Sequence, residues 1–147
     1  MPPKRGKIRA NADAAKTHGK IASKIETIRE LNINFSLRYL DWDSEKFTFT
    51  DMQGNYFRTL LERVQEVSKM PLRDFVTQPN RTLRNHRIDF GDSGVTEPGF
   101  GIPLGEEYDS NAWQFSLSVN EHGRVHGFFI DNTFYVVWLD AGHALYR

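Results

Sequence analysis

The strongest constraint on the fold is an alternation of apolar and polar residues near the C-terminus. Over residues 113–119 every second residue is apolar, which is typical of a strand with one buried face. Turn-forming sequences at 120–123 and 131–132 then separate two further apolar runs, 124–130 and 133–139. The sequence therefore predicts a three-stranded antiparallel β-meander.

The lengths of the two turns predict which side chains share a face of this meander. A two-residue loop at 131–132 pairs His126 with Val137, and a three-residue loop at 121–123 pairs Ser118 with His126. In this register the dry face consists of Trp113, Phe115, Leu117, Val119, Val125, Gly127, Phe129, Phe134, Val136 and Trp138. The other face is predicted to meet solvent, and it carries Gln114, Ser116, Ser118, Arg124, His126, Phe128 and Tyr135.

The start of the chain combines helical and extended patterns. Isoleucines at helical spacing predict a short helix over 21–31, and a period of two predicts a strand over 33–39. Phe47 and Phe49 mark a short return strand after a polar turn. We therefore expect strand structure before the meander as well as within it.

Two helices are predicted between the early strands and the meander. One apolar face runs along 52–70, and Pro71 can begin a short helix over 72–76. A long connection, 78–110, is rich in Gly and Pro and leads to the meander. The predicted fold class is α+β, with N-terminal helices packed on a C-terminal antiparallel β-meander in a single domain over 21–147.

Composition excludes several classes of protein. The chain has no cysteine, which rules out disulfides, thiolate metal sites and a cysteine nucleophile. The longest apolar runs are far shorter than the ~20 residues that cross a bilayer, and the N-terminus lacks the apolar core of a secretion signal. We therefore expect a cytoplasmic protein with no membrane association.

Charge is unevenly distributed although the net charge is zero. Residues 1–30 contain eight Lys and Arg against three Asp and Glu, whereas residues 31–147 contain eleven against sixteen. Residues 1–20 are interpreted as a flexible basic arm on an acidic body, which favours contact with phosphates or with an acidic partner. A solubilising tail is the alternative.

The polar face of the meander carries residue types suited to RNA chemistry. Histidine moves protons near neutral pH, arginine neutralises phosphate, and aromatic rings stack on unpaired bases. The C-terminal residues His143, Tyr146 and Arg147 can fold back onto this face. The candidate catalytic residues are His86, Arg124, His126, Tyr135, His143 and Tyr146. The alternative is an ordinary solvated sheet face.

A second basic cluster lies in the long connection. Arg81, Arg84, His86 and Arg87 either contact phosphate or pair with acidic residues near 106–109. The candidate nucleic-acid-binding residues are Lys4, Arg5, Lys7, Arg9, Arg81, Arg84, Arg87 and Arg147. The glycines of the connection lack the signature of a phosphate-binding loop, and we expect neither a metal site nor a cofactor.

A helical first half followed by a meander ending in VHGFFIDNTFYVVWLDAGHALY resembles the RelE/ParE-type toxin fold. The resemblance covers residues 110–147 and, less well, the helices over 52–77. It implies cleavage of messenger RNA, often in the ribosome, and it implies functional roles for Arg124, His143 and Tyr146.

These patterns together predict a metal-independent endoribonuclease of toxin or phage-defence type that cleaves RNA by 2′-hydroxyl attack. The predicted base is His126 or His86, the predicted acid is His143 or Tyr146, and Arg124 and Arg87 are the predicted transition-state cations. The predicted partners are RNA or the ribosome, together with an antitoxin or another protein. The alternatives are a non-catalytic nucleic-acid- or protein-binding module, acting through its basic arm and sheet face, and an inhibitor that uses its acidic body.

Overall fold

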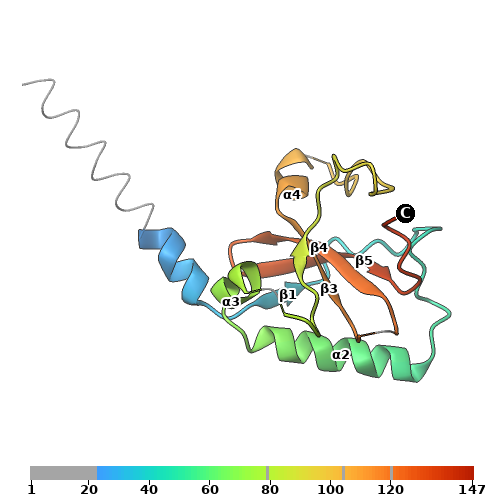
Figure 1. Ribbon diagram of the computed structural model, residues 1–147, viewed down its shortest axis with the longest axis horizontal. Helices are drawn as coiled ribbons and strands as arrows, with labels where there is room; N and C mark the ends of the chain where they lie inside the picture. Colours follow the sequence, from blue (N-terminus) through green and yellow to red (C-terminus); the bar gives the residue numbers. More distant parts are fainter. Residues whose placement is uncertain (1–22, 79, 104, 120) are drawn as a thin grey trace, which may run out of the picture.

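The computed structural model describes residues 23–78, 80–103, 105–119 and 121–147, and the predicted arm over 1–20 lies outside them (Figure 1). A first helix covers residues 23–30, and the later helices are α2 (Gly54–Ser68), α3 (Leu72–Thr77) and α4 (Glu106–Ser110). The strands are β1 (Asn34–Ser36), β2 (His86–Arg87), β3 (Ala112–Ser116), β4 (Arg124–Ile130) and β5 (Thr133–Asp140). The fold class is therefore α+β, as predicted.

The five strands form one sheet in the order β1-β5-β4-β3-β2 (Figure 1). β3, β4 and β5 form the predicted antiparallel meander. β1 pairs with β5 in parallel, and β2 pairs with β3 in antiparallel orientation. The sheet is larger than predicted, because β1 from the first half and β2 from the long connection extend the meander at its two edges.

The observed register preserves the predicted faces near the turns and changes them at a β-bulge. The 131–132 turn pairs Phe128 with Tyr135 as predicted, but a shift between His126 and Gly127 then pairs His126 with Trp138 rather than with Val137. The extra residue moves Trp138 to the face predicted to be polar. The prediction for Trp138 is therefore wrong.

The loop between β3 and β4 is also longer than predicted. Ser116 pairs with Arg124, whereas the predicted three-residue loop paired Ser118 with His126. The N–H of Leu117 donates to the carbonyl oxygen of Gly123 at 3.2 Å and closes the ladder next to the Ser116–Arg124 pair. The partner of each β3 residue is thus displaced by four residues, an even number, so each side chain of β3 keeps its predicted face.

One face of the sheet packs against α2 and α3. The apolar positions of α2 recur every three or four residues, so Tyr56 and Val67 point to the same side and are buried. Phe75 of α3 packs edge-on against Phe115 of β3 at 6.2 Å between ring centroids. The sheet also contributes Phe134, and these rings are the centre of the first hydrophobic cluster.

The opposite face of the sheet is also covered, and the prediction that it meets solvent is wrong. The long connection and the segment before α2 carry apolar side chains of their own, which pack on this face. The resulting second cluster contains Phe47, Ile88, Val95, Phe100, Ala112, Phe128, Val137, Trp138 and Leu145. Phe47 therefore belongs to this covering layer and not to the predicted return strand, since residues 47–49 form no strand.

No helix in the described ranges combines the length and the apolar character needed to cross a lipid bilayer.

Candidate functional site

His126, a predicted catalytic residue, is fully buried at 0% exposure. Its ring lies edge-on to Phe47 and Trp138, each about 6.2 Å away between centroids. The covering layer over the second face therefore separates this imidazole from solvent. The prediction that His126 faces a ligand from an open sheet is wrong for this physical reason.

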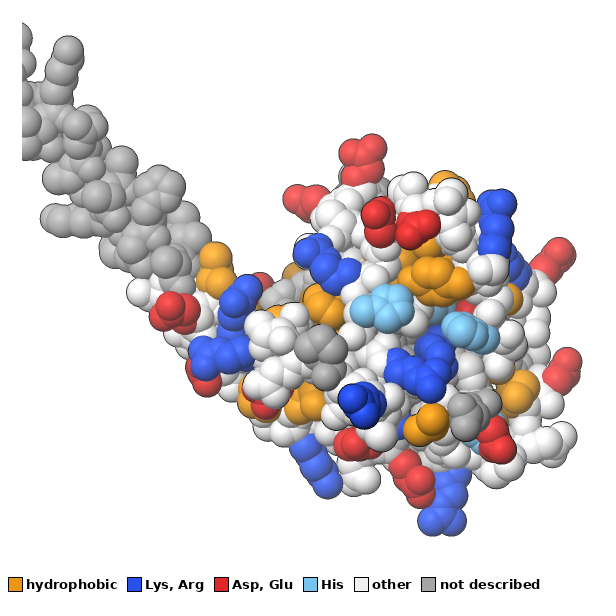
Figure 2. Space-filling model, viewed as in Figure 1, with side chains coloured by type: hydrophobic (Ala, Val, Ile, Leu, Met, Phe, Trp, Pro, Cys, Tyr) orange, Lys and Arg blue, Asp and Glu red, His pale blue; other side chains and the backbone are white. Residues whose placement is uncertain are grey.

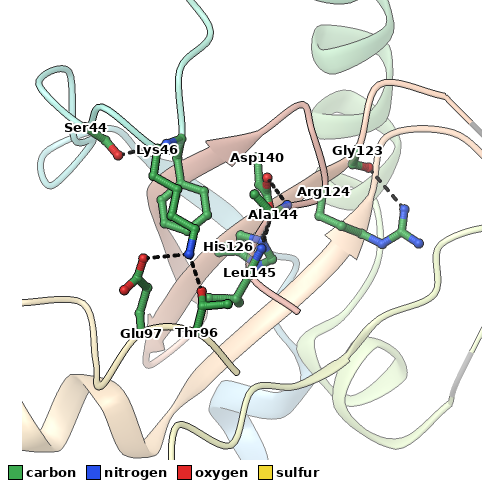
Figure 3. Close-up of polar contacts among 11 residues, drawn as sticks. Ser44, Lys46, Thr96, Glu97, Gly123, Arg124, His126, Asp140, Ala144 and Leu145 are labelled. Atoms are coloured by element: carbon green, nitrogen blue, oxygen red, sulfur yellow. Dashed lines mark hydrogen bonds and ion pairs between the residues drawn. The ribbon is translucent and has the colours of Figure 1, made fainter. Parts of the chain in front are cut away.

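His126 instead forms a buried pair with Asp140 at the end of β5 (Figure 3). Its Nε2 lies 3.0 Å from Oδ2 of Asp140. Burial lowers the pKa of His126, so the ring is held neutral and Nε2–H donates to the carboxylate. Burial alone would raise the pKa of Asp140, but hydrogen bonds from His126 and from the N–H groups of Ala144 and Leu145 outweigh it and lower this pKa.

Arg124, the cross-strand neighbour of Asp140, lies at the edge of this buried network. The residue is only 8% exposed, and its Nη1 donates to the carbonyl oxygen of Gly123 at 3.2 Å. Its Nε has no hydrogen-bond partner. Burial first, and then the positive charge of Arg84, lower the pKa of Arg124. The two neighbouring positive charges of Arg124 and Arg84 favour an anionic ligand.

Arg124 lines an open pocket of about 370 Å³ together with Arg84, His122 and His143. These residues come from the long connection, the β3–β4 loop, β4 and the C-terminal turn. Glu121 also lines the pocket, and one of its carboxylate oxygens lies 3.6 Å from Nε2 of His122. Figure 2 shows histidine side chains beside Lys or Arg side chains in the middle of one face.

The backbone around this pocket is in an uncommon conformation. Arg84, His122 and His143 have φ values of 49°, 65° and 54°, in the left-handed region that side chains other than glycine rarely adopt. Such conformations cost free energy and often accompany functional sites. Three of the residues lining one pocket share this property.

His143 is exposed, and it lines the pocket together with Arg84 and Arg124. Burial of part of its ring first, and then the charges of Arg124 and Arg84, lower its pKa, while Asp140 acts in the opposite direction. At neutral pH its imidazole is therefore largely unprotonated and can accept a proton.

His86 and Tyr146 form a second group of predicted residues. Their ring centroids lie 5.9 Å apart in an edge-on arrangement. His86 is exposed on β2, and its Nδ1 lies 2.8 Å from its acceptor, the carbonyl oxygen of Arg87. Burial, followed by the charges of Asp92 and Asp89, raises the pKa of Tyr146, so its phenol stays protonated at neutral pH.

Several other predicted residues are used elsewhere. The ring of Tyr135 stacks on Phe128 at 5.2 Å between centroids, and Arg87 donates to the carbonyl oxygen of Ser110. Arg81 and Arg147 are exposed and do not line the pocket. The structure therefore does not bring these side chains to the pocket. The arm residues Lys4, Arg5, Lys7 and Arg9 lie outside the described residues.

The burial of four polar side chains on β3 and β4 was not predicted. Gln114 lies opposite His126, and Ser116 lies opposite Arg124, on the paired strands β3 and β4. Each of these four residues has a buried side-chain polar atom without a hydrogen-bond partner: Oε1 of Gln114, Oγ of Ser116, Nε of Arg124 and Nδ1 of His126. Alternation assigned all four to one face, but only the fold shows that this face is covered.

Within the described residues, no group of three or more His, Asp and Glu side chains is arranged to hold a metal ion. No family model, curated protein or solved structure matches the chain significantly.

Proposed function

We propose that the chain is a metal-independent endoribonuclease of toxin or phage-defence type that cleaves RNA by 2′-hydroxyl attack. The proposal rests on one observation, the meeting of Arg84, Arg124 and His143 around one open pocket. Two cations beside an unprotonated imidazole are the groups needed to hold a phosphodiester and to accept the proton of its neighbouring hydroxyl.

In the proposed reaction, His143 removes the proton of the ribose 2′-hydroxyl. The 2′-oxygen then bonds to phosphorus, and the bond between phosphorus and the 5′-oxygen breaks. Arg84 and Arg124 stabilise the negative charge on the phosphoryl oxygens, and a proton delivered to the leaving 5′-oxygen completes the step. The products are a 2′,3′-cyclic phosphate and a 5′-hydroxyl. The proton for the 5′-oxygen comes from water, because Tyr146, whose phenol stays protonated at neutral pH, does not line the pocket.

The burial of His126 changes the assignment of roles. The sequence favoured His126 or His86 as the base and His143 or Tyr146 as the acid, whereas we now propose His143 as the base. A RelE/ParE-like arrangement of helices and sheet, a ribosomal or free RNA substrate, a cytoplasmic location and an antitoxin partner belong to the same proposal.

The test is cleavage of end-labelled RNA by the purified full chain. His143→Gln should lower the cleavage rate by about 10²–10⁴-fold, the usual contribution of a positioned general base. Arg58→Ala is the matched control, because Arg58 is exposed on α2 and pairs with Glu62 at 2.8 Å. Equal rates for His143→Gln and the unaltered chain would contradict the proposal, and so would products without a cyclic phosphate end.

A second candidate is a non-catalytic module that binds RNA through the same pocket. It is favoured by the full burial of His126, which removes one proton-transfer group from the accessible surface. Under this alternative the chain binds RNA, Arg84→Ala weakens the binding, and the RNA stays intact.

A further inference from the structure

We infer that His86, Gln114 and Tyr146 form a subsite that binds one unpaired nucleobase beside the phosphate pocket. The inference deepens the proposed function and depends on its RNA ligand, because it names which part of the RNA lies next to the phosphate. Two independent observations support it: a partly exposed pair of rings and a buried amide without a partner.

The first observation is the ring pair itself. His86 lies on β2, the short edge strand, and Tyr146 lies on the C-terminal segment. This segment is held in place by a bridge between Tyr146 and Val95 and by a hydrogen bond from Arg147 N–H to the Gly94 carbonyl oxygen at 2.8 Å. The backbones of both rings are therefore fixed, and the rings need only reorient to hold a flat base between them.

The second observation is Gln114, which lies directly opposite His86 in the sheet. Cross-strand neighbours share a face and have Cβ atoms about 5 Å apart. Gln114 is only 3% exposed, and its Oε1 has no hydrogen-bond partner. A buried acceptor without a partner costs free energy, and the N–H group of a base edge would satisfy it.

The position of this subsite suits one nucleotide. His86, Gln114 and His126 are paired across three neighbouring strands and so form one row across the sheet. Arg124 lies two residues along β4 from His126, in the next row on the same face. Rows two residues apart are separated by about 7 Å along a strand, and β2 lies two strands, about 10 Å, from β4. A phosphate held by Arg124 and Arg84 would therefore place the base of the same or the adjoining nucleotide over His86 and Tyr146. The amide of Gln114 can both donate and accept, so it can distinguish one base edge from another.

The experiment measures binding of the full chain to short 2′-O-methyl oligonucleotides, which cannot undergo 2′-hydroxyl attack. The probes are adenine, cytosine and uracil hexamers and an abasic hexamer with the same backbone. The unaltered chain should bind at least one base-containing probe about 5–100-fold more tightly than the abasic probe, the usual effect of stacking one base. Tyr146→Leu should remove this difference and leave abasic binding unchanged.

Gln114→Leu should make the three base-containing probes bind equally. It should not lower the melting temperature, because it removes a buried polar atom that has no partner. Ser116→Ala is the matched control: Ser116 is equally buried on β3 and also lacks a partner, but it lies in the next row. The ratios of the Ser116→Ala affinities for the three base-containing probes should match those of the unaltered chain.

The inference is wrong if Tyr146→Leu weakens abasic and base-containing probes equally, or if Gln114→Leu preserves the ratios between bases. Failure of the proposed function looks different. If the unaltered chain distinguishes bases through Gln114 but does not cut unmodified RNA, the catalytic proposal falls and the subsite stands. If it binds no probe, both fall.

Discussion

His143 reaches the pocket on a turn whose backbone is held by Asp140. The carboxylate accepts N–H groups from Ala144 at 2.7 Å and Leu145 at 3.1 Å, and the Asp140 carbonyl oxygen accepts the N–H of His143 at 3.2 Å. Asp140 also lies opposite Arg124 in the β-ladder. One buried residue thus fixes the backbone positions of both a cation and the proposed base. The neutral ring of His126 donates to Oδ2 of Asp140, the oxygen that also accepts the N–H of Leu145.

The pH dependence of cleavage should report the lowered pKa of His143. A base is active when unprotonated, so kcat/KM should rise with pH through an apparent pKa below 6.5, the ordinary value from which the pKa of His143 is lowered. Arg84→Ala removes a neighbouring positive charge. It should therefore move this rise toward higher pH and reduce the plateau by about 10²–10³-fold, the usual effect of losing one group that stabilises transition-state charge.

The pH profile is measured with the unaltered chain, Arg84→Ala and Arg58→Ala on the same RNA. Arg58→Ala should keep both the plateau and the midpoint. A midpoint that does not move in Arg84→Ala would show that the titrating group lies elsewhere.

At the scale of single elements, the meander was predictable from sequence because its information is local. Alternation and turn residues define β4 and β5 without reference to the rest of the chain. They also define which side chains of β3 share a face of the sheet. The bulge between His126 and Gly127 was not predictable. The composition of a strand does not reveal that the pairing with its neighbour shifts by one residue partway along. It moves Trp138 to the second face, where its ring stacks on Phe47 at 4.5 Å between centroids.

Gly127 makes this bulge possible. A Cβ at this position would collide with the carbonyl oxygen of Tyr135 and with the ring of Phe134. Gly127→Ala should therefore destabilise the fold by about 1–3 kcal/mol, the usual cost of overpacking a core. Gly54→Ala is the control, because a Cβ there meets nothing within 4 Å, and alanine should slightly stabilise α2. Urea unfolding curves of both variants measure the difference, and equal midpoints would contradict this account of the bulge.

At the scale of the whole molecule, the candidate site depends on contacts between segments far apart in the chain. The types of residue in the pocket were predictable, since Arg84, Arg124 and His143 all came from clusters that the sequence singles out. Their meeting was not, because the long connection carries no periodic signal that predicts where it packs. The same missing information explains why His126 was wrongly predicted to be accessible. Its face of the sheet was correctly identified, but the layer that covers this face comes from residues distant in sequence.

The charge of the pocket should also appear in the salt dependence of RNA binding. A protein that contacts single-stranded nucleic acid through Z cations has an affinity that falls with log salt concentration with a slope of about −0.7Z. Arg84→Ala removes one pocket cation, so it should make the slope shallower by about 0.7, while Arg58→Ala should leave it unchanged. Removing residues 1–20, which contain six Lys and Arg, measures the contribution of the basic N-terminus separately. If the truncated chain loses all salt dependence and Arg84→Ala loses none, phosphate is bound by the N-terminus and not by the pocket.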